Sequence, residues 1–212
     1  MKLSTSHQLY NYWNDVRAGR LAPRRFEIEP SRIAAILPDT FILERIDSST
    51  SRFRLAGTRI CEAFVAEFRG INIFDMFSPV DRVTLKQTFA TIAGDGAVGV
   101  VTFEGATESG KTVEFEMLIV PLIHTNDMLD RFLGSIAPLA HPQWLGHEPV
   151  TISRLKGQQI NWPEGRPHAV VDAMQRQTPF MPHVRNARIV RVDRRQFRVY
   201  EGGLGQTETD GN

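Results

Sequence analysis

The chain has 212 residues, 42% of them hydrophobic, and its 25 lysines and arginines nearly balance 24 aspartates and glutamates. This length fits one domain with an extension or two small domains, and the charge balance argues against a polyanionic partner for the whole chain. The single cysteine excludes an internal disulfide and a cysteine-cluster metal site. No apolar run approaches the ~20 residues of a membrane helix, and the N-terminus lacks the apolar core of a secretory signal. We therefore expect a cytoplasmic protein without a membrane span.

The first predicted element is a helix that begins near Ser4 and ends near Gly19. Its apolar residues recur at helical spacing and form one stripe, Leu9, Tyr12, Trp13 and Val16. Because large aromatic side chains are enriched at interfaces, we predict that this stripe forms the interface of a homodimer. The alternative is a monomer in which the helix folds back over its own sheet. A second, short helix begins near Pro30, so residues 1–40 are predicted as an N-terminal helical segment.

Two strands are predicted next, Phe41–Ile46 and Arg52–Ala56, with a polar turn between them. In the second strand, Phe53 and Leu55 alternate with arginines, which indicates one buried and one solvated face. The alternation then stops. We expect short helical segments there, followed by a longer helix that begins near Ser78.

Three further strands are predicted, Val98–Gly105, Thr112–Leu122 and Arg131–Leu139. The middle one is the clearest, because Phe115 and Met117 alternate with glutamates. The links between these strands are short and turn-like, which favours antiparallel neighbours. The sequence therefore predicts an α+β fold, with a five-stranded antiparallel sheet that carries helices on one face. Phe115 and Met117 are expected to face those helices.

Residues 141–212 are rich in proline and are predicted to form an arm, with a short hairpin and a disordered tail. The hairpin would pair Ala187–Val192 with Phe197–Tyr200. It carries a predicted basic patch for a nucleotide, a phosphate or an acidic partner, formed by Arg185, Arg188, Arg191 and Arg198. The alternative is a solvated hairpin. Few aromatic residues interleave with the arginines, so no nucleic-acid partner is expected.

The order of elements and several motifs resemble the PAS domain. In GTRICEAFVAEFRGINIFDMFSPVDR (Gly57–Arg82), a short helix leads to a glycine, an apolar helical turn and a Pro-x-Asp-Arg helix start. The segments YWNDVRAGRLAPRR, FRLAGTRIC and FRVYEGG are similar to a family of short bacterial single-PAS proteins, largely of unknown function. The resemblance implies a PAS-like domain over residues 41–140. It also implies a sensor or interaction module in signal transduction that acts through protein contacts.

PAS domains enclose a cavity between their helices and the inner face of the sheet, so the resemblance implies such a cavity here. By position, the residues that would line a pocket for an unidentified small molecule are Phe53, Leu55, Phe64, Phe68, Ile73, Leu85, Phe89, Val101, Phe103, Phe115 and Met117. The alternative is a fully packed core without a ligand, because apolar side chains at core spacing normally form only a core.

Candidate cofactor residues are few. Ile73 stands where the light-sensing PAS subgroup has its reactive cysteine, so the resemblance implies no flavin adduct, and Cys61 is expected to be a small apolar residue. The long helix has no histidine of the kind that haem-binding PAS domains present, and the other histidines lack metal-ligand spacing. No nucleophile elbow or phosphate loop occurs, so we predict a protein that is not an enzyme. A structural adaptor with a filled core and an unrecognised small-molecule enzyme remain the alternatives.

Overall fold

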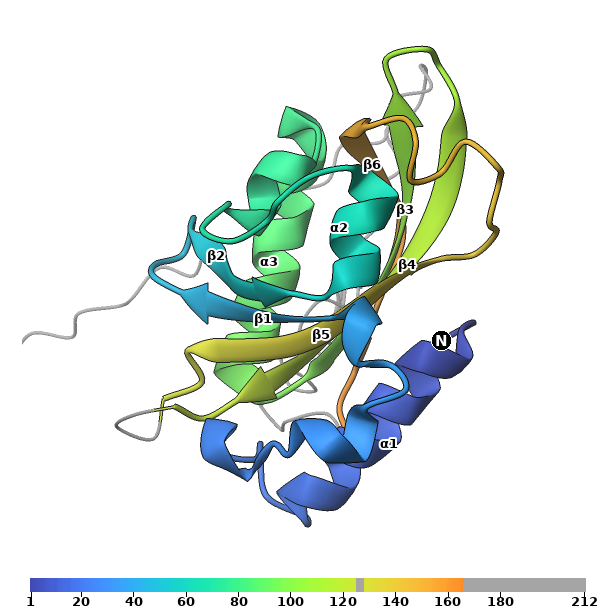
Figure 1. Ribbon diagram of the computed structural model, residues 1–212. Coiled ribbons are helices and arrows are strands. Elements are labelled where there is room, and N and C mark those ends of the chain that lie inside the picture. The colour runs from blue at the N-terminus through green and yellow to red at the C-terminus, as the bar shows by residue number, and fades with distance from the viewer. Residues whose placement is uncertain (125–127, 166–212) are drawn as a thin grey trace, which may run out of the picture. The chain divides into compact units, whose positions relative to one another are not determined.

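The computed structural model describes residues 1–124 and 128–165 (Figure 1). The predicted hairpin, the basic patch and the C-terminal tail therefore lie outside the described residues. The described α-helices are α1 (Ser4–Arg17), α2 (Thr58–Phe64) and α3 (Pro79–Asp95), and the short 3₁₀ helices are η1 (Arg25–Glu27), η2 (Pro30–Ile33), η3 (Leu37–Asp39) and η4 (Ile73–Met76). The strands are β1 (Thr40–Arg45), β2 (Ser51–Ala56), β3 (Val98–Thr107), β4 (Thr112–Leu122), β5 (Arg131–Pro138) and β6 (Val150–Asn161).

The described strands form one antiparallel sheet in the order β2-β1-β5-β4-β3-β6. The predicted α+β architecture is confirmed, but the sheet has six strands, so the prediction of five was wrong. The additional strand is β6, which pairs with β3 along its whole length, from Val98 opposite Asn161 to Thr107 opposite Val150. It falls in the stretch for which the sequence predicts a proline-rich arm.

The sequence does not reveal β6 because it is a polar edge strand. Most of its residues are exposed, although Ser153 is buried, and two register shifts against β3 interrupt the alternation that would mark a strand. Edge strands tolerate both features, since one side of the ladder has no neighbouring strand. The other side of β6 is hydrogen-bonded to the start of α3. The amide of Ser78 donates to the carbonyl of Ser153 at 3.0 Å, and the amide of Leu155 donates to the Asp81 carboxylate at 3.1 Å.

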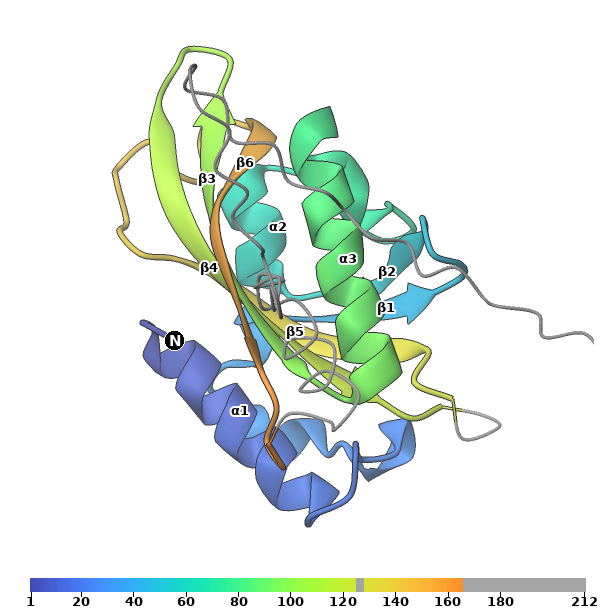
Figure 2. The same ribbon diagram turned by 180° about the vertical axis from the view of Figure 1, so that it is seen from behind.

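The inner face of the sheet is covered by α2 and α3, which lie together on one side of it in both views (Figures 1 and 2). Residues of η4 belong to the same buried cluster. Phe115 and Met117 are fully buried on this face, as the alternation in β4 predicts. The rings of Phe64 and Phe103 stack on Phe115, with centroids 4.9 and 5.2 Å away. Contacts of this kind add to the stabilisation that the buried apolar area itself gives.

The outer face is covered by α1 and by the segment that follows it (Figure 2). Three residues of the apolar stripe, Leu9, Tyr12 and Trp13, are buried against their own sheet, and Val16 packs at the margin. The indole of Trp13 donates a buried hydrogen bond of 2.8 Å to the carbonyl of Pro121 in β4. The helix thus folds back over its own sheet, which is the alternative to a dimer interface formed by the stripe. A homodimer remains a prediction, but with this packing its interface needs a surface other than the stripe.

The start of α1 is capped from the sheet. Leu3 occupies the N-cap position, and its side chain cannot accept a hydrogen bond. The carboxylate of Glu116 in β4, 1% exposed, accepts hydrogen bonds from the amides of Lys2 (2.5 Å) and Leu3 (3.0 Å) instead. Burial on its own raises the pKa of Glu116. The hydrogen bonds from Ser6, Leu3 and Lys2 and the positive N-terminus outweigh burial, and the pKa lies below its ordinary value of 4.5.

We predict that Glu116 makes the stability of the fold depend on pH. Its folded-state pKa is lowered, so its contribution is fully present above the unfolded pKa of about 4.5 and is lost as the pH falls through the folded value. Glu116→Gln should therefore lower the free energy of unfolding by about 1–3 kcal/mol at pH 7. The gap between wild type and variant in urea unfolding should narrow from pH 5 to pH 3. The exposed neighbour provides the control Glu114→Gln, and an equal gap at both pH values for Glu116→Gln would contradict the prediction.

The second prediction concerns the inner core. Phe115→Ala removes a fully buried ring that contacts two others, so it should lower the free energy of unfolding by about 3–5 kcal/mol. Urea unfolding followed by circular dichroism measures this change. Glu114→Ala, at the adjacent exposed position of β4, should change it by less than about 0.5 kcal/mol. A loss below about 1 kcal/mol for Phe115→Ala would mean that the ring lines an open space.

Candidate functional site

The residues predicted to line an inner cavity are, with one exception, brought together by the fold. They belong to the buried cluster between the sheet and the helices: Phe53, Phe64, Phe68, Ile73, Leu85, Phe89, Val101, Phe103, Phe115 and Met117. Their rings contact each other closely, for example Phe53 with Phe68 at 5.0 Å between centroids. A fully packed core without a ligand, the alternative to a pocket, predicts this packing. Ligand binding at the inner face remains a prediction.

Leu55 is the exception, and its placement is a correction. Leu43 pairs with Phe53 while Ile42 pairs with Leu55, so Arg54 is an extra residue in β2. Such a β-bulge reverses the alternation of side chains, because two residues on one strand oppose one on the other. Phe53 therefore points to the inner core, whereas Leu55 shares the outer face with Ile42 and is 45% exposed. The sequence pattern alone gave no sign of the bulge.

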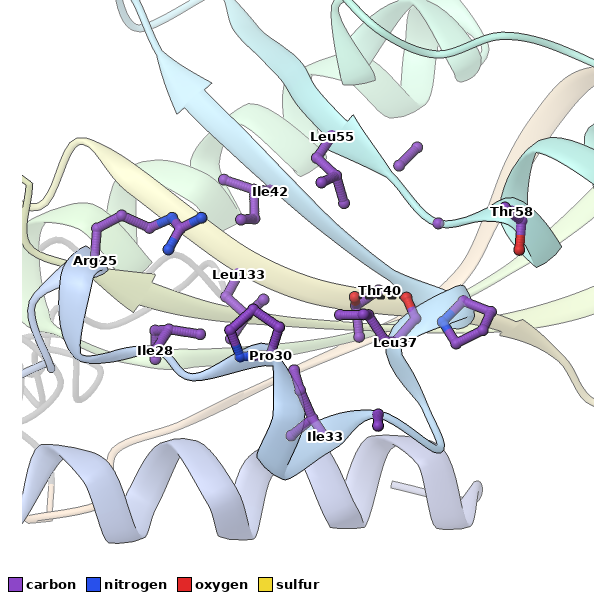
Figure 3. Close-up of a pocket in the computed structure, with 14 residues that line it drawn as sticks. Arg25, Ile28, Pro30, Ile33, Leu37, Thr40, Ile42, Leu55, Thr58 and Leu133 are labelled. Carbon is purple, nitrogen blue, oxygen red and sulfur yellow. Dashed lines mark hydrogen bonds between the residues drawn. The ribbon is translucent and has the colours of Figure 1, made fainter.

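Leu55 instead lines an apolar groove on the outer face of the sheet, a hollow of about 380 Å³. Figure 3 shows Leu55 and Ile42 on one side of it, Ile33 and Leu37 on the other, and Leu133 between them. The full lining is Arg25, Ile28, Pro30, Ile33, Ala34, Leu37, Pro38, Thr40, Ile42, Leu55, Ala56, Gly57, Thr58 and Leu133. Segments that are distant in the sequence, η1 to η3, β1, β2 and β5, thus form one concave apolar surface.

One wall of the groove is the segment between α1 and β1. Pro30 opens η2, where its fixed φ suits a first helical position, and Ile28 and Ile33 anchor the segment in the outer core. The segment is also hydrogen-bonded to the end of β4. The amide of Arg25 donates to the carbonyl of Ile123 at 2.7 Å, and the amide of Ile123 donates to the carbonyl of Pro23 at 2.9 Å. The wall is therefore held by two buried isoleucines and by hydrogen bonds at its start.

The far end of the groove is closed by the turn from β2 into α2. The amide of Gly57 donates to the carbonyl of Thr40 at 2.8 Å, which brings the glycine against the backbone of Pro38. Beside this contact, the guanidinium of Arg59 in α2 pairs with the Asp39 carboxylate of η3 at 2.8 Å. The position of α2 is thus linked directly to the wall of the groove.

The open end of the groove carries positive charge. A second hollow continues the first and is lined by Arg25, Ile42, Arg54, Leu55, His124 and Arg131. Two of these arginines are paired, because Arg131 and Arg54 contact the two carboxylate oxygens of Glu44 at 2.7 and 3.3 Å. Arg131 also lies 3.9 Å from Asp130. In contrast, the Arg25 guanidinium forms no ion pair or hydrogen bond within the described residues, and it points over the groove (Figure 3).

The cofactor candidates are placed as follows. Ile73 is fully buried in the inner core, and Cys61 is half-buried and packs against the same core. Within residues 1–124 and 128–165, no cluster of histidine, cysteine or acidic side chains could hold a metal ion. In the same ranges, no helix combines the length and the apolar character needed to cross a membrane. The predictions of no flavin adduct and no haem remain predictions.

Residues 1–137 match the model of the PAS_5 family, described as a PAS domain. This match covers more than half of the chain, so the chain belongs to the PAS domain family. PAS domains are in general sensory modules rather than catalytic ones. The matched span begins at residue 1, so it includes α1 and the segment after it as well as the PAS-like domain predicted from residue 41.

Several solved structures are similar to the chain. A light-oxygen-voltage domain studied with a flavin analogue is 14% identical with a TM-score of 0.41, and the match covers 52% of this chain and 86% of that one. The LOV protein of Rhodobacter sphaeroides is 13% identical, with a TM-score of 0.40 and coverage of 49% and 60%. A PAS domain from Colwellia psychrerythraea is 11% identical, with a TM-score of 0.40 and coverage of 52% and 98%. No curated protein matches the chain.

We predict that Gly57 is needed to close the groove. A Cβ added at Gly57 would overlap the backbone carbonyl of Pro38, which cannot move without shifting η3. Gly57→Ala should therefore lower the free energy of unfolding by about 1–3 kcal/mol. Gly157→Ala is the matched control, because an added Cβ there meets no atom within 4 Å, and it should stay within about 0.5 kcal/mol of wild type. Urea unfolding of both variants tests this, and equal stabilities would contradict it.

Proposed function

We propose that the protein is a non-catalytic PAS sensor module that receives a small-molecule signal in the outer groove and passes it to a protein partner. The single observation that supports this proposal is the contrast between the two faces of the sheet. The predicted inner pocket is filled with contacting aromatic rings, whereas the outer groove is a hollow of about 380 Å³ with an apolar lining. At one end of the groove lies Arg25, which has no ion-pair partner within residues 1–124 and 128–165. Ligand pockets typically combine such an apolar lining with a few polar groups.

The groove also lies beside segments whose movement on ligand binding would change the surface of the protein. Its wall is the segment that joins α1 to β1, and its far end is linked to α2 through the Arg59–Asp39 pair. A ligand that binds one arrangement of this segment better than another shifts the population toward that arrangement. The position of the segment, rather than any chemical step, is then the output that a partner protein reads. We place this activity in the cytoplasm of a bacterium, in keeping with the resemblance to short bacterial PAS proteins.

The packed inner face also favours a second candidate, a structural adaptor that binds no small molecule. In that case the groove would be filled by a protein surface, and ligand-dependent changes in stability would be absent. The two functions differ in a measurable way, because a ligand that binds only the folded state stabilises it by about 2.7 kcal/mol at 100 times its Kd.

Thermal unfolding of the full chain in the presence of a library of small metabolites tests the proposed function. Wild type should be stabilised by at least one compound. Leu55→Arg places a charge in the groove at an exposed position and should abolish that stabilisation. Ile152→Arg makes the same change at a 37% exposed position on β6, at the opposite edge of the sheet, and should retain it.

Two results would contradict the proposal. A compound that stabilises Leu55→Arg as strongly as wild type would bind elsewhere, with the inner face as the first candidate. A library in which no compound stabilises wild type, while a partner protein binds wild type and not Leu55→Arg, would favour the adaptor.

A further inference from the structure

We infer that the groove recognises an amphipathic monocarboxylate, a small molecule with one apolar chain or ring and one carboxylate. The apolar part would lie between Leu37 and Leu55, and the carboxylate would pair with Arg25. This inference deepens the proposed function and rests on it, because it names the chemical class of the ligand for the same site.

The apolar half of the site is built from side chains of five elements, η2, η3, β1, β2 and β5. Ile33 and Leu37 from the N-terminal segment face Ile42 and Leu55 from the first two strands, and Leu133 of β5 forms the floor (Figure 3). Leu37 and Leu55 are 36% and 45% exposed, so a ligand that covers them removes apolar surface from water. Few polar side chains line this half of the groove. One of them, the hydroxyl of Thr40, donates a hydrogen bond of 2.9 Å to the carbonyl of Leu37. This half of the groove therefore suits a hydrocarbon chain or an aromatic ring.

In the charged half of the site, the arginines outnumber the nearby carboxylates by one. Three arginines line the two hollows, and the carboxylates near them are Glu44 and Asp130. Glu44 engages both Arg131 and Arg54. The guanidinium of Arg25, half-buried at the junction of the hollows, is the group for which the described residues offer no counterion.

The guanidinium of Arg25 sets the charge of the ligand. A guanidinium binds a carboxylate through two parallel charge-assisted hydrogen bonds, and such bonds are strong in a site that excludes water. A phosphate or a dicarboxylate would bring a second negative charge toward Glu44 and Asp130, which already flank the open end through their arginine partners. One negative charge on an apolar body is therefore the complement of this groove.

Titration calorimetry with octanoate and the full chain tests the inference at pH 7. Octanol and octylammonium keep the chain and change the head group, and acetate keeps the head group without the chain. Octanoate should bind wild type more tightly than each of the other three. Arg25→Gln should weaken octanoate binding by about tenfold or more, as expected for a lost hydrogen bond to a charged group, and should leave octanol unchanged.

Arg52→Gln is the matched control. It makes the same change of charge at an exposed arginine of β2 that does not line the groove, so octanoate should bind it as wild type. An equal effect of both variants would mean that octanoate responds only to net charge, which would overturn the inference.

The remaining outcomes separate this inference from the proposed function. If octanol or octylammonium binds better than octanoate, and Leu55→Arg abolishes that binding, the groove is a ligand site and the monocarboxylate class is wrong. If none of the compounds binds, and sedimentation shows a wild-type dimer that Leu55→Arg converts to a monomer, a second copy of the chain fills the groove and both proposals fall. Octanoate binding that Leu55→Arg leaves intact would place the ligand outside the groove and also overturn both.

Discussion

The fold depends on a sheet that has to be covered on both faces. Strand β4 shows this most directly, because Phe115 and Met117 are fully buried on its inner face and Leu118 and Val120 are fully buried on its outer face. Antiparallel sheets commonly leave one face in water. A strand with apolar side chains on both of its faces excludes that arrangement. The chain covers the inner face with α2, η4 and α3 and the outer face with α1. The buried Glu116 carboxylate and the Trp13 hydrogen bond fix α1 in place, since each satisfies a polar group that would otherwise be buried without a partner.

The groove forms where the outer face of the sheet is no longer covered by α1. Helix α1 contacts β4 and β5, whereas the outer side of β1 and β2 is faced by the short helices η1 to η3. Three short helices cannot present the continuous apolar face of a long helix, so Leu37 and Leu55 stay partly exposed. The proposed ligand site thus lies where the outer face of the sheet is only partly covered, and not in the aromatic core.

The candidate site also illustrates where pattern reasoning has limits. The alternation in Arg52–Ala56 correctly predicts a strand and correctly assigns Phe53 to the core, but it assigns Leu55 to the same face. One extra residue in the pairing with β1 reverses the side of the sheet for every position that follows. A bulge is defined by the pairing of two strands, so neither strand reveals it alone. Arg25 was missed for a related reason, because its role in the proposal depends on which described residues lie beside it, and these are distant in the sequence.

The sequence by itself determined the α+β class, the order of the elements as far as β5, the PAS resemblance and most of the inner core, because local periodicity and the motif of Gly57–Arg82 carry that information. It also required the stripe of Leu9, Tyr12 and Trp13 to be buried, since so much apolar surface cannot remain in water. Only the tertiary structure decided that the stripe covers its own sheet, that a polar stretch forms the edge strand β6, and that Leu55 and Arg25 meet at one groove. Each of these outcomes depends on strand register and on contacts between distant segments, which periodicity along the chain does not encode.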